Sequence, residues 1–145
     1  MDFDIHPVPL SGRVRALLHR NQLPTSDIEA GDAVLLFSSV REQHLAGVVG
    51  LQVFGRLALL RSLAVSESER GRGLGGALVR YAEKHAASLG VRSLYLLTTS
   101  ADQFFAAQGY SRISRADSPA VIAATAQFSG LCPSSSAFMV KVLRP

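Results

Sequence analysis

Residues 57–89 constrain the fold more than any other part of the chain. There, a mostly apolar stretch is followed by a polar turn, a cluster of glycines and arginines, and an amphipathic stretch. Gly71, Gly73 and Gly75 are separated by single residues and Gly76 follows directly, so no Cβ atoms keep a ligand from the backbone of the turn. Because the first N–H groups of a helix lack partners and its dipole is positive there, this order predicts a site for a phosphorylated ligand.

Apolar residues recur at helical spacing after the turn. They predict a helix from Gly73 to Leu89, with Gly90 as its left-handed stop. Arg70 and Arg72 add positive charge at the rim of the turn. A second interpretation stays open, in which the glycines only make a tight connection and the two arginines belong to a solvated surface.

Two other phosphate-binding motifs fit this turn less well. Gly71, Gly73 and Gly76 also satisfy the G-x-G-x-x-G spacing of dinucleotide-binding folds, which place an acidic residue at the end of the next strand. The next predicted strand, at 93–98, ends without a carboxylate. A Walker A loop is excluded because neither Gly-Lys-Ser nor Gly-Lys-Thr occurs in the sequence.

The composition is that of a globular protein. With 145 residues, of which 48% are hydrophobic and 18% charged, the chain is expected to form one domain over 1–145. It has no apolar run of about 18 residues, so no membrane partner is expected. The acidic start, Met1-Asp2-Phe3-Asp4, does not resemble a signal peptide, and a cytoplasmic location is the default expectation.

The single cysteine and the charge narrow the function classes further. Cys132 cannot form an internal disulfide, and without a His or Cys neighbour at ligand spacing it predicts no metal site. The net charge of +4 comes from thirteen arginines and two lysines against eleven acidic residues, a bias that suits contacts with phosphate or carboxylate. Nucleic acid is not an expected partner, because the arginines are scattered and no lysine-rich tail or aromatic ladder accompanies them.

The apolar pattern predicts an α/β fold, a mixed sheet with helices on both faces. Three runs, at 33–40, 45–54 and 57–65, are separated by gaps of hairpin length and predict an antiparallel meander. Ahead of them, Ser11 is expected to cap a short helix that ends near Asn21.

The second half of the chain continues this pattern. A buried strand at 91–98 is expected to pair parallel to the strand at 57–65 through a right-handed crossover. The remaining expected elements are a helix at 101–108 with a Ser100–Gln103 capping box, a strand at 110–114, a helix from Ser118 and Pro119 to near Gly130, and a strand at 137–143.

With these elements placed, the chain resembles the GNAT-fold N-acetyltransferases, a family that uses acetyl-coenzyme A (acetyl-CoA). The family signature is Arg or Gln, two residues, Gly, one residue, then Gly or Ala, and residues 70–75 match it. The apolar stretch 63–65 fits the family's fourth strand, and 104–110 resembles its helix end of two aromatics, three residues, Gly and an aromatic. Because the element order also agrees from Leu10 to Leu143, the resemblance covers nearly the whole chain.

The resemblance implies a bulge that splays the fourth strand from the fifth, with the pantetheine arm of acetyl-CoA between them. Main-chain groups of Leu63 and Val65 are then the expected catalytic groups, one N–H near the bulge polarising the acetyl carbonyl. The residues expected to bind acetyl-CoA are Leu63, Ala64, Val65, Arg70, Gly71, Arg72, Gly73, Leu74, Gly75, Gly76, Phe104 and Phe105.

Four stretches carry a resemblance to a narrower subgroup of the family. They lie at 60–63, 96–99, 104–105 and 124–133. Together they resemble a subgroup associated with arsenic-resistance operons, similar to amino-acid acetyltransferases that act on arsinothricin and phosphinothricin. This resemblance implies direct acetyl transfer, in a ternary complex, to the primary amine of a small acidic molecule.

Two positions depart from the family pattern. Phe105 stands where many members have a tyrosine that protonates the departing thiolate, and Gln52 stands where related sequences can carry a glutamate base. The chain is then either an enzyme in which positioning supplies most of the acceleration, or a CoA-binding sensor or interaction module without turnover. Acetylation of protein or peptide N-termini also stays open, as does the choice between monomer and homodimer.

Arg61 is the leading candidate for substrate recognition, because a charge within an apolar strand is costly unless it meets an anion. Strand alternation predicts that it shares a sheet face with Leu59, Leu63 and Val65.

The anion that Arg61 meets is left open by the sequence. It is either an acidic group of the substrate, for which Arg41 is the second candidate, or an internal partner such as Glu67 or Asp32. Cys132 offers one thiolate, too few to chelate trivalent arsenic in a monomer, and is expected to shape the substrate loop. The expected substrate contacts are Arg61, Arg41, Gln52, Ser62, Thr98 and Cys132.

Overall fold

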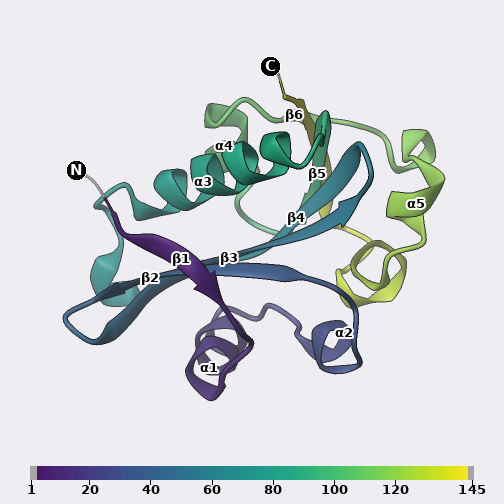
Figure 1. The fold of residues 1–145 in the computed structure, drawn as a ribbon. Helices are drawn as coiled ribbons and strands as arrows, with labels where there is room; N and C mark the ends of the chain where they lie inside the picture. The colour runs from purple at the N-terminus through teal and green to yellow at the C-terminus, as the bar shows by residue number, and fades with distance from the viewer. Residues whose placement is uncertain (1–2, 144–145) are drawn as a thin grey trace.

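Seven strands form one mixed sheet, in the order β1-β2-β3-β4-β5-β7-β6 (Figure 1). The computed structural model of the protein describes residues 3–143. Met1 and Asp2, part of the acidic start that does not resemble a signal peptide, lie outside the described residues. All neighbouring pairs are antiparallel except β4 and β5, which run parallel. The strands are β1 (Ile5–Val8), β2 (Leu35–Arg41), β3 (His44–Phe54), β4 (Leu57–Val65), β5 (Ser93–Thr98), β6 (Ser111–Arg112) and β7 (Ala137–Val142).

The predicted meander and parallel crossover are confirmed as β2, β3, β4 and β5. β1 is an element that the sequence analysis did not predict. Its four residues include Pro7 and show no clear alternation of buried and exposed positions, so neither of the usual strand signals is present. It pairs with β2 at the edge of the sheet.

Helices cover both faces of the sheet, as Figure 1 shows. α3 (Leu74–Ser88) lies on one face, where the largest core cluster joins it to β3, β4 and β5. α1 (Gly12–Arg20) and α2 (Ser26–Glu29) lie on the opposite face. The predicted ends of α1 and α3 are confirmed, because the Ser11 hydroxyl accepts from the Val14 N–H and Gly90 takes a φ of 89° just beyond α3.

α4 (Asp102–Ala107) begins without a side-chain cap, so the predicted Ser100–Gln103 capping box is wrong. The Thr98 hydroxyl at the end of β5 accepts instead from the Ala101 N–H at 3.0 Å. The Thr98 bond is made to the residue before the helix, whereas a Ser100 cap would accept from the Gln103 N–H.

The helix predicted from Ser118 to near Gly130 is divided in two. α5 (Ala120–Ala123) ends where the Thr125 hydroxyl donates to the Ile122 carbonyl and accepts from the Phe128 N–H. These side-chain bonds compete with the helical pattern, and a π-helical turn, η3 (Gln127–Leu131), follows. Two short 3-10 turns, η1 (Glu67–Glu69) and η2 (Arg115–Asp117), complete the chain. Within residues 3–143, no helix is long and apolar enough to cross a membrane.

Candidate functional site

β4 and β5 separate soon after they meet. Their parallel pairing covers only three positions and ends at Leu59 and Tyr95, after which β5 pairs with β7 alone. The second half of β4, residues 60–65, therefore has β3 on one side and no paired strand on the other. This parting agrees with the splayed fourth and fifth strands that the GNAT resemblance implies.

A bulge in β4 lies beside the opening. Val49 of β3 lies opposite both Ser62 and Leu63, so β4 carries one extra residue at this point. Ser62 takes a φ of 57°, in the left-handed region that costs an ordinary residue about 1 kcal/mol or more. A buried serine held in this conformation indicates that the surrounding structure fixes the bulge.

The bulge corrects one prediction. Leu63 and Val65 do not share the sheet face of Arg61, because they contact the core cluster on the α3 side. Ala64 packs instead against the cluster that contains the buried residues of α1. One inserted residue reverses which side chains point to each face, and strict alternation cannot anticipate it.

Main-chain groups of β4 face the opening. The Ser66 N–H donates to the Ala46 carbonyl of β3 at 2.8 Å. Because hydrogen-bonding direction alternates along a strand, the main-chain groups of Leu63 and Val65 point away from β3, toward the parted side. Consistent with this, the Val65 carbonyl accepts from Arg70 Nε at 3.3 Å. The catalytic and CoA-binding roles expected of Leu63 and Val65 stay predictions.

The glycine turn presents free main-chain N–H groups at the start of α3. The first backbone bond of the helix runs from the Ala77 N–H to the Gly73 carbonyl, and among the described residues no backbone carbonyl accepts from the N–H groups of 71–76. Gly71 and Gly73 have φ values of 80° and 86°, and open space lies where a Cβ would stand. The turn is therefore accessible to an anion at the positive end of the helix.

The flanking arginines differ in their surroundings. Both are exposed, but Arg70 donates to Asn21 Oδ1 at 3.0 Å. Arg41 pairs with Glu69 at 3.1 Å, and its side chain is 46% exposed. Arg41 thus lies beside the glycine turn, at the hairpin end of β2, and shares no contact with Arg61.

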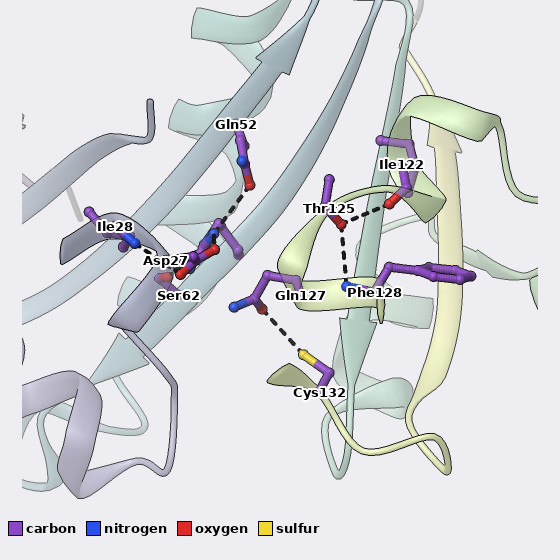
Figure 2. Close-up of polar contacts among 10 residues, drawn as sticks. Asp27, Ile28, Gln52, Ser62, Ile122, Thr125, Gln127, Phe128 and Cys132 are labelled. Carbon is purple, nitrogen blue, oxygen red and sulfur yellow. Dashed lines mark hydrogen bonds and ion pairs between the residues drawn. The ribbon is translucent and has the colours of Figure 1, made fainter. Parts of the chain in front are cut away.

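A buried polar cluster lies around Arg61 and includes Asp27 of α2, on the face opposite α3. Figure 2 shows Asp27, Gln52 and Ser62 of this cluster. The Arg61 guanidinium donates to both carboxylate oxygens of Asp27, at 2.5 and 2.8 Å, and to Gln52 Oε1 at 3.2 Å. Its Nε donates to the Ser62 hydroxyl at 3.2 Å. The ion-pair alternative is thus what the structure contains, although the partner is Asp27 rather than Glu67 or Asp32.

Asp27 is ionised in this cluster. Burial raises the pKa of its carboxyl group, but the hydrogen bonds and charge of Arg61, with the Ile28 N–H, outweigh burial and hold the pKa below its ordinary value of 3.8. The side chains of Arg61 and Asp27 are 1% and 4% exposed, so the pair is shielded from water. Its charges cancel locally, and whether Arg61 also contacts substrate stays a prediction.

Asp27 is not among the predicted site residues, because the apolar pattern predicts no helix at α2. One signal was available: Ser26 and Glu29 have the spacing of a capping box. The turn is held by a different bond, from the Thr25 hydroxyl to Glu29 Oε2 at 2.6 Å.

The segment after α5 brings a second polar group toward this cluster (Figure 2). Cys132 Sγ donates to Gln127 Oε1 at 3.2 Å, and the Cys132 N–H donates to the Gln127 carbonyl at 3.0 Å. Burial raises the pKa of the Cys132 thiol, while the charges of Arg61 and Arg115 oppose this shift. Cys132 is thus a neutral thiol whose surroundings include the Arg61–Asp27 pair. Gln127 is not among the expected site residues. Thr98, which is among them, accepts from the Ala101 N–H and has no hydrogen bond to Gln127 or Cys132.

The two phenylalanines of α4 play different structural parts. The Phe104 ring lies 3.5 Å from the position that a Cβ on Gly75 would take, so it borders the glycine turn. Phe105 is buried in the main core against Tyr110, with ring centroids 5.7 Å apart. Burial and the neighbouring Glu83 raise the pKa of Tyr110, whose hydroxyl donates to that carboxylate, so Tyr110 does not replace the missing tyrosine as an acid.

Comparisons with known proteins agree with this geometry. N-acetylglutamate synthase from Neisseria gonorrhoeae, complexed with coenzyme A and N-acetyl-glutamate, matches with a TM-score of 0.79 at 19% identity, over 100% of this chain and 36% of that chain. This chain therefore spans little more than a third of the synthase. Rv2747 from Mycobacterium tuberculosis, in complex with CoA, matches with a TM-score of 0.78 at 18% identity, over 97% of this chain and 99% of that one. Tetrahymena GCN5 matches with a TM-score of 0.72 at 20% identity, over 100% of this chain and 98% of that one.

At these identities the solved structures establish the fold alone. The family profile goes further, because that of the acetyltransferase (GNAT) family matches residues 12–112, more than half of the chain. The matched range contains the glycine turn, the bulge and the parted strands. The chain therefore belongs to the GNAT family of acetyltransferases, which use acetyl-CoA.

Proposed function

We propose that this GNAT acetyltransferase moves an acetyl group directly to the primary amine of a small acidic amino acid, within a ternary complex. The observation that carries the proposal is the parting of β4 from β5 beside a turn of free main-chain N–H groups. Acetyl-CoA supplies the activated acetyl thioester. The proposal includes no covalent acetyl-enzyme step, because the pKa of the Cys132 thiol is raised and its side-chain partner within residues 3–143 is the Gln127 amide rather than a base.

The glycine turn would hold the diphosphate of acetyl-CoA. The N–H groups of 71–76 are donors without backbone acceptors, and the α3 dipole adds positive potential at the same place. Arg72 is exposed at the rim and available for a charged contact. Phe104 would border the cofactor beside Gly75.

The open edge of β4 would bind the pantetheine arm and stabilise the reacting carbonyl. The main-chain N–H and C=O groups of Leu63 and Val65 point to the parted side, as an added extended segment requires. An N–H near the bulge can stabilise the oxyanion that forms when the amine attacks, and loss of one such donor typically costs about 3 kcal/mol. Because the donors are main-chain groups, side-chain substitution at these positions understates their contribution.

Proton transfer would depend on the substrate and on water. Phe105 and Gln52 carry no ionisable group, and Asp27 is held as a carboxylate by Arg61. The amine must therefore arrive neutral, or lose its proton through water, before it attacks. The rate is expected to rise with pH until the amine is fully neutral.

Two observations support an acidic amino acid as the substrate. The N-acetylglutamate synthase match was solved with N-acetyl-glutamate, the acetylated form of an acidic amino acid. Two of the stretches on which the resemblance to the arsenic-resistance subgroup rests are polar in the fold. Residues 60–63 supply the Arg61–Ser62 bond of the buried cluster, and residues 124–133 supply the Gln127–Cys132 bond. Glutamate, phosphinothricin and arsinothricin are accordingly the first substrates to test.

A thiol-release assay tests the proposal. The protein is mixed with acetyl-CoA and each member of a panel of acidic amino acids, aromatic amines, polyamines and peptide N-termini, and the product is identified by mass spectrometry. The proposal expects thiol release that depends on an acidic amino acid, with the acetyl group on its amine. Preference for peptides would instead move the assignment to protein acetylation.

A second function, a CoA-binding sensor or interaction module without turnover, is favoured by one observation. Neither Gln52 nor Phe105 can act as an acid or base, and Asp27, the carboxylate of the buried cluster that contains Gln52, is paired with Arg61. Tight CoA binding without thiol release for any amine would support this module.

A further inference from the structure

Gln127 has a buried donor that no protein group satisfies. Its side chain belongs to a residue only 7% exposed, and its Nε2 has no hydrogen-bond partner among the described residues. A buried amide N–H without an acceptor is costly. Such a group calls for a specific acceptor.

One hydrogen bond orients the Gln127 amide. Cys132 Sγ donates to Gln127 Oε1, which places the oxygen toward the thiol and the NH2 group on the other side. The backbone bond from the Cys132 N–H to the Gln127 carbonyl closes the same turn. Figure 2 shows the Gln127 nitrogen directed away from Cys132, toward the side on which Asp27 and Ser62 lie.

Nearby acceptors on the protein are already engaged. Both Asp27 oxygens accept from Arg61, and Gln52 Oε1 accepts from the same guanidinium. The ion pair has no net charge, so it neither repels nor strongly attracts an incoming anion. The group without a partner on this side of the site is the Gln127 amide N–H, which is a donor rather than an acceptor.

We infer that the Gln127 amide recognises an acid oxygen of the amine substrate, a role that rests on the proposed acetyl transfer. Gln127 is then a specificity residue, placed by the π-helical turn and locked by Cys132. It would favour substrates with a carboxylate, phosphinate or arsonate oxygen over amines without one, because only the former satisfy the buried N–H.

Gln127→Met tests this role, since methionine keeps the length of the side chain and lacks a donor. The wild-type protein, Gln127→Met and the exposed control Gln103→Met are compared by thiol release with glutamate, phosphinothricin and arsinothricin as probes. Gln127→Glu is a second variant, which keeps the shape of the side chain and repels an anion. CoA affinity and circular dichroism check that each variant is folded.

The inference expects KM for the acidic amine to rise about tenfold in Gln127→Met and at least as much in Gln127→Glu. KM for acetyl-CoA stays unchanged in both, and Gln103→Met behaves as wild type. If KM for the acidic amine is unchanged in both variants, the role of Gln127 is overturned while acetyl transfer itself stands. The same conclusion follows if the wild-type protein acetylates only neutral amines. CoA binding without transfer to any amine overturns both.

Discussion

Arg61 and Asp27, 34 residues apart in the sequence, form a buried bidentate ion pair across β4 and α2. The same guanidinium donates to Ser62, whose left-handed backbone makes the bulge of β4. The pair therefore ties α2 to the point at which β4 turns its main chain toward the opening. An arginine that the sequence offers as a substrate contact is thus also a structural element of the site.

Asp27→Asn is expected to lower the free energy of unfolding by about 3 kcal/mol, because it leaves the buried guanidinium without its counter-charge. Urea denaturation measures the change. The matched control is Asp102→Asn, which removes an ion pair between side chains that are 38% and 67% exposed and should cost far less stability, because solvent screens the pair. If the two variants lost the same free energy of unfolding, the buried pair would contribute no more to stability than the exposed one.

The same pair predicts how stability changes with acid. Because the folded-state pKa of Asp27 lies below 3.8, its contribution is fully present above that pH and is lost as pH falls through the folded-state pKa. The difference in unfolding free energy between wild type and Asp27→Asn should therefore be largest near neutral pH and shrink below about pH 4. Lowered pKa values at Glu29 and Asp102 affect both proteins equally and cancel in this difference. A difference that stays constant down to pH 3 would contradict the ionised state of Asp27.

Gly73→Ala should weaken CoA binding about tenfold, since strain at a φ of 86° displaces the N–H groups of the turn. Gly90→Ala is the matched control, because Gly90 has a φ of 89° at the other end of the same helix and equally open space for a Cβ. Both variants should lose about 1 kcal/mol of stability, and only Gly73→Ala should lose CoA affinity. Calorimetric titration with CoA decides, and equal affinities in the two variants would count against the phosphate role of the turn.

Ser62→Val should destabilise the protein by about 2 kcal/mol, because a β-branched side chain is poorly tolerated at a φ of 57°. Ser62→Gly should change stability by less than about 1 kcal/mol, since relief of backbone strain offsets the lost bond to Arg61. Ser93→Val, at a regular position of β5, is the control and should be tolerated. If Ser62→Val unfolds at the same urea concentration as Ser93→Val, the bulge does not constrain β4.

Much of the fold followed from local patterns. The alternation of β2 to β4, the spacing of apolar residues in α3 and the left-handed Gly90 each depend on neighbours within a few residues, and these elements were predicted nearly to their ends. β1 and α2 were missed because each is four residues long. Short elements of this kind are stabilised by tertiary contacts more than by their own pattern.

The candidate site was predictable only in part. The glycine turn was visible because the ligand-facing groups belong to consecutive residues. The partner of Arg61 was not, since the pairing spans 34 residues and depends on how α2 packs beneath β4. The bulge at Ser62 carries no sequence signature, so strand alternation assigned Leu63 and Val65 to the wrong face. Gln127 was overlooked because its unmatched donor exists only once the chain is folded.

The central claim is that free N–H groups at the start of α3 bind the diphosphate of CoA. Calorimetric titration with CoA and with pantetheine, which lacks the nucleotide and its phosphates, tests this claim most directly. Saturable binding of CoA at one site per chain, with pantetheine at least about a hundredfold weaker, is the predicted result. No heat with CoA, or equal affinity for the two compounds, would contradict it.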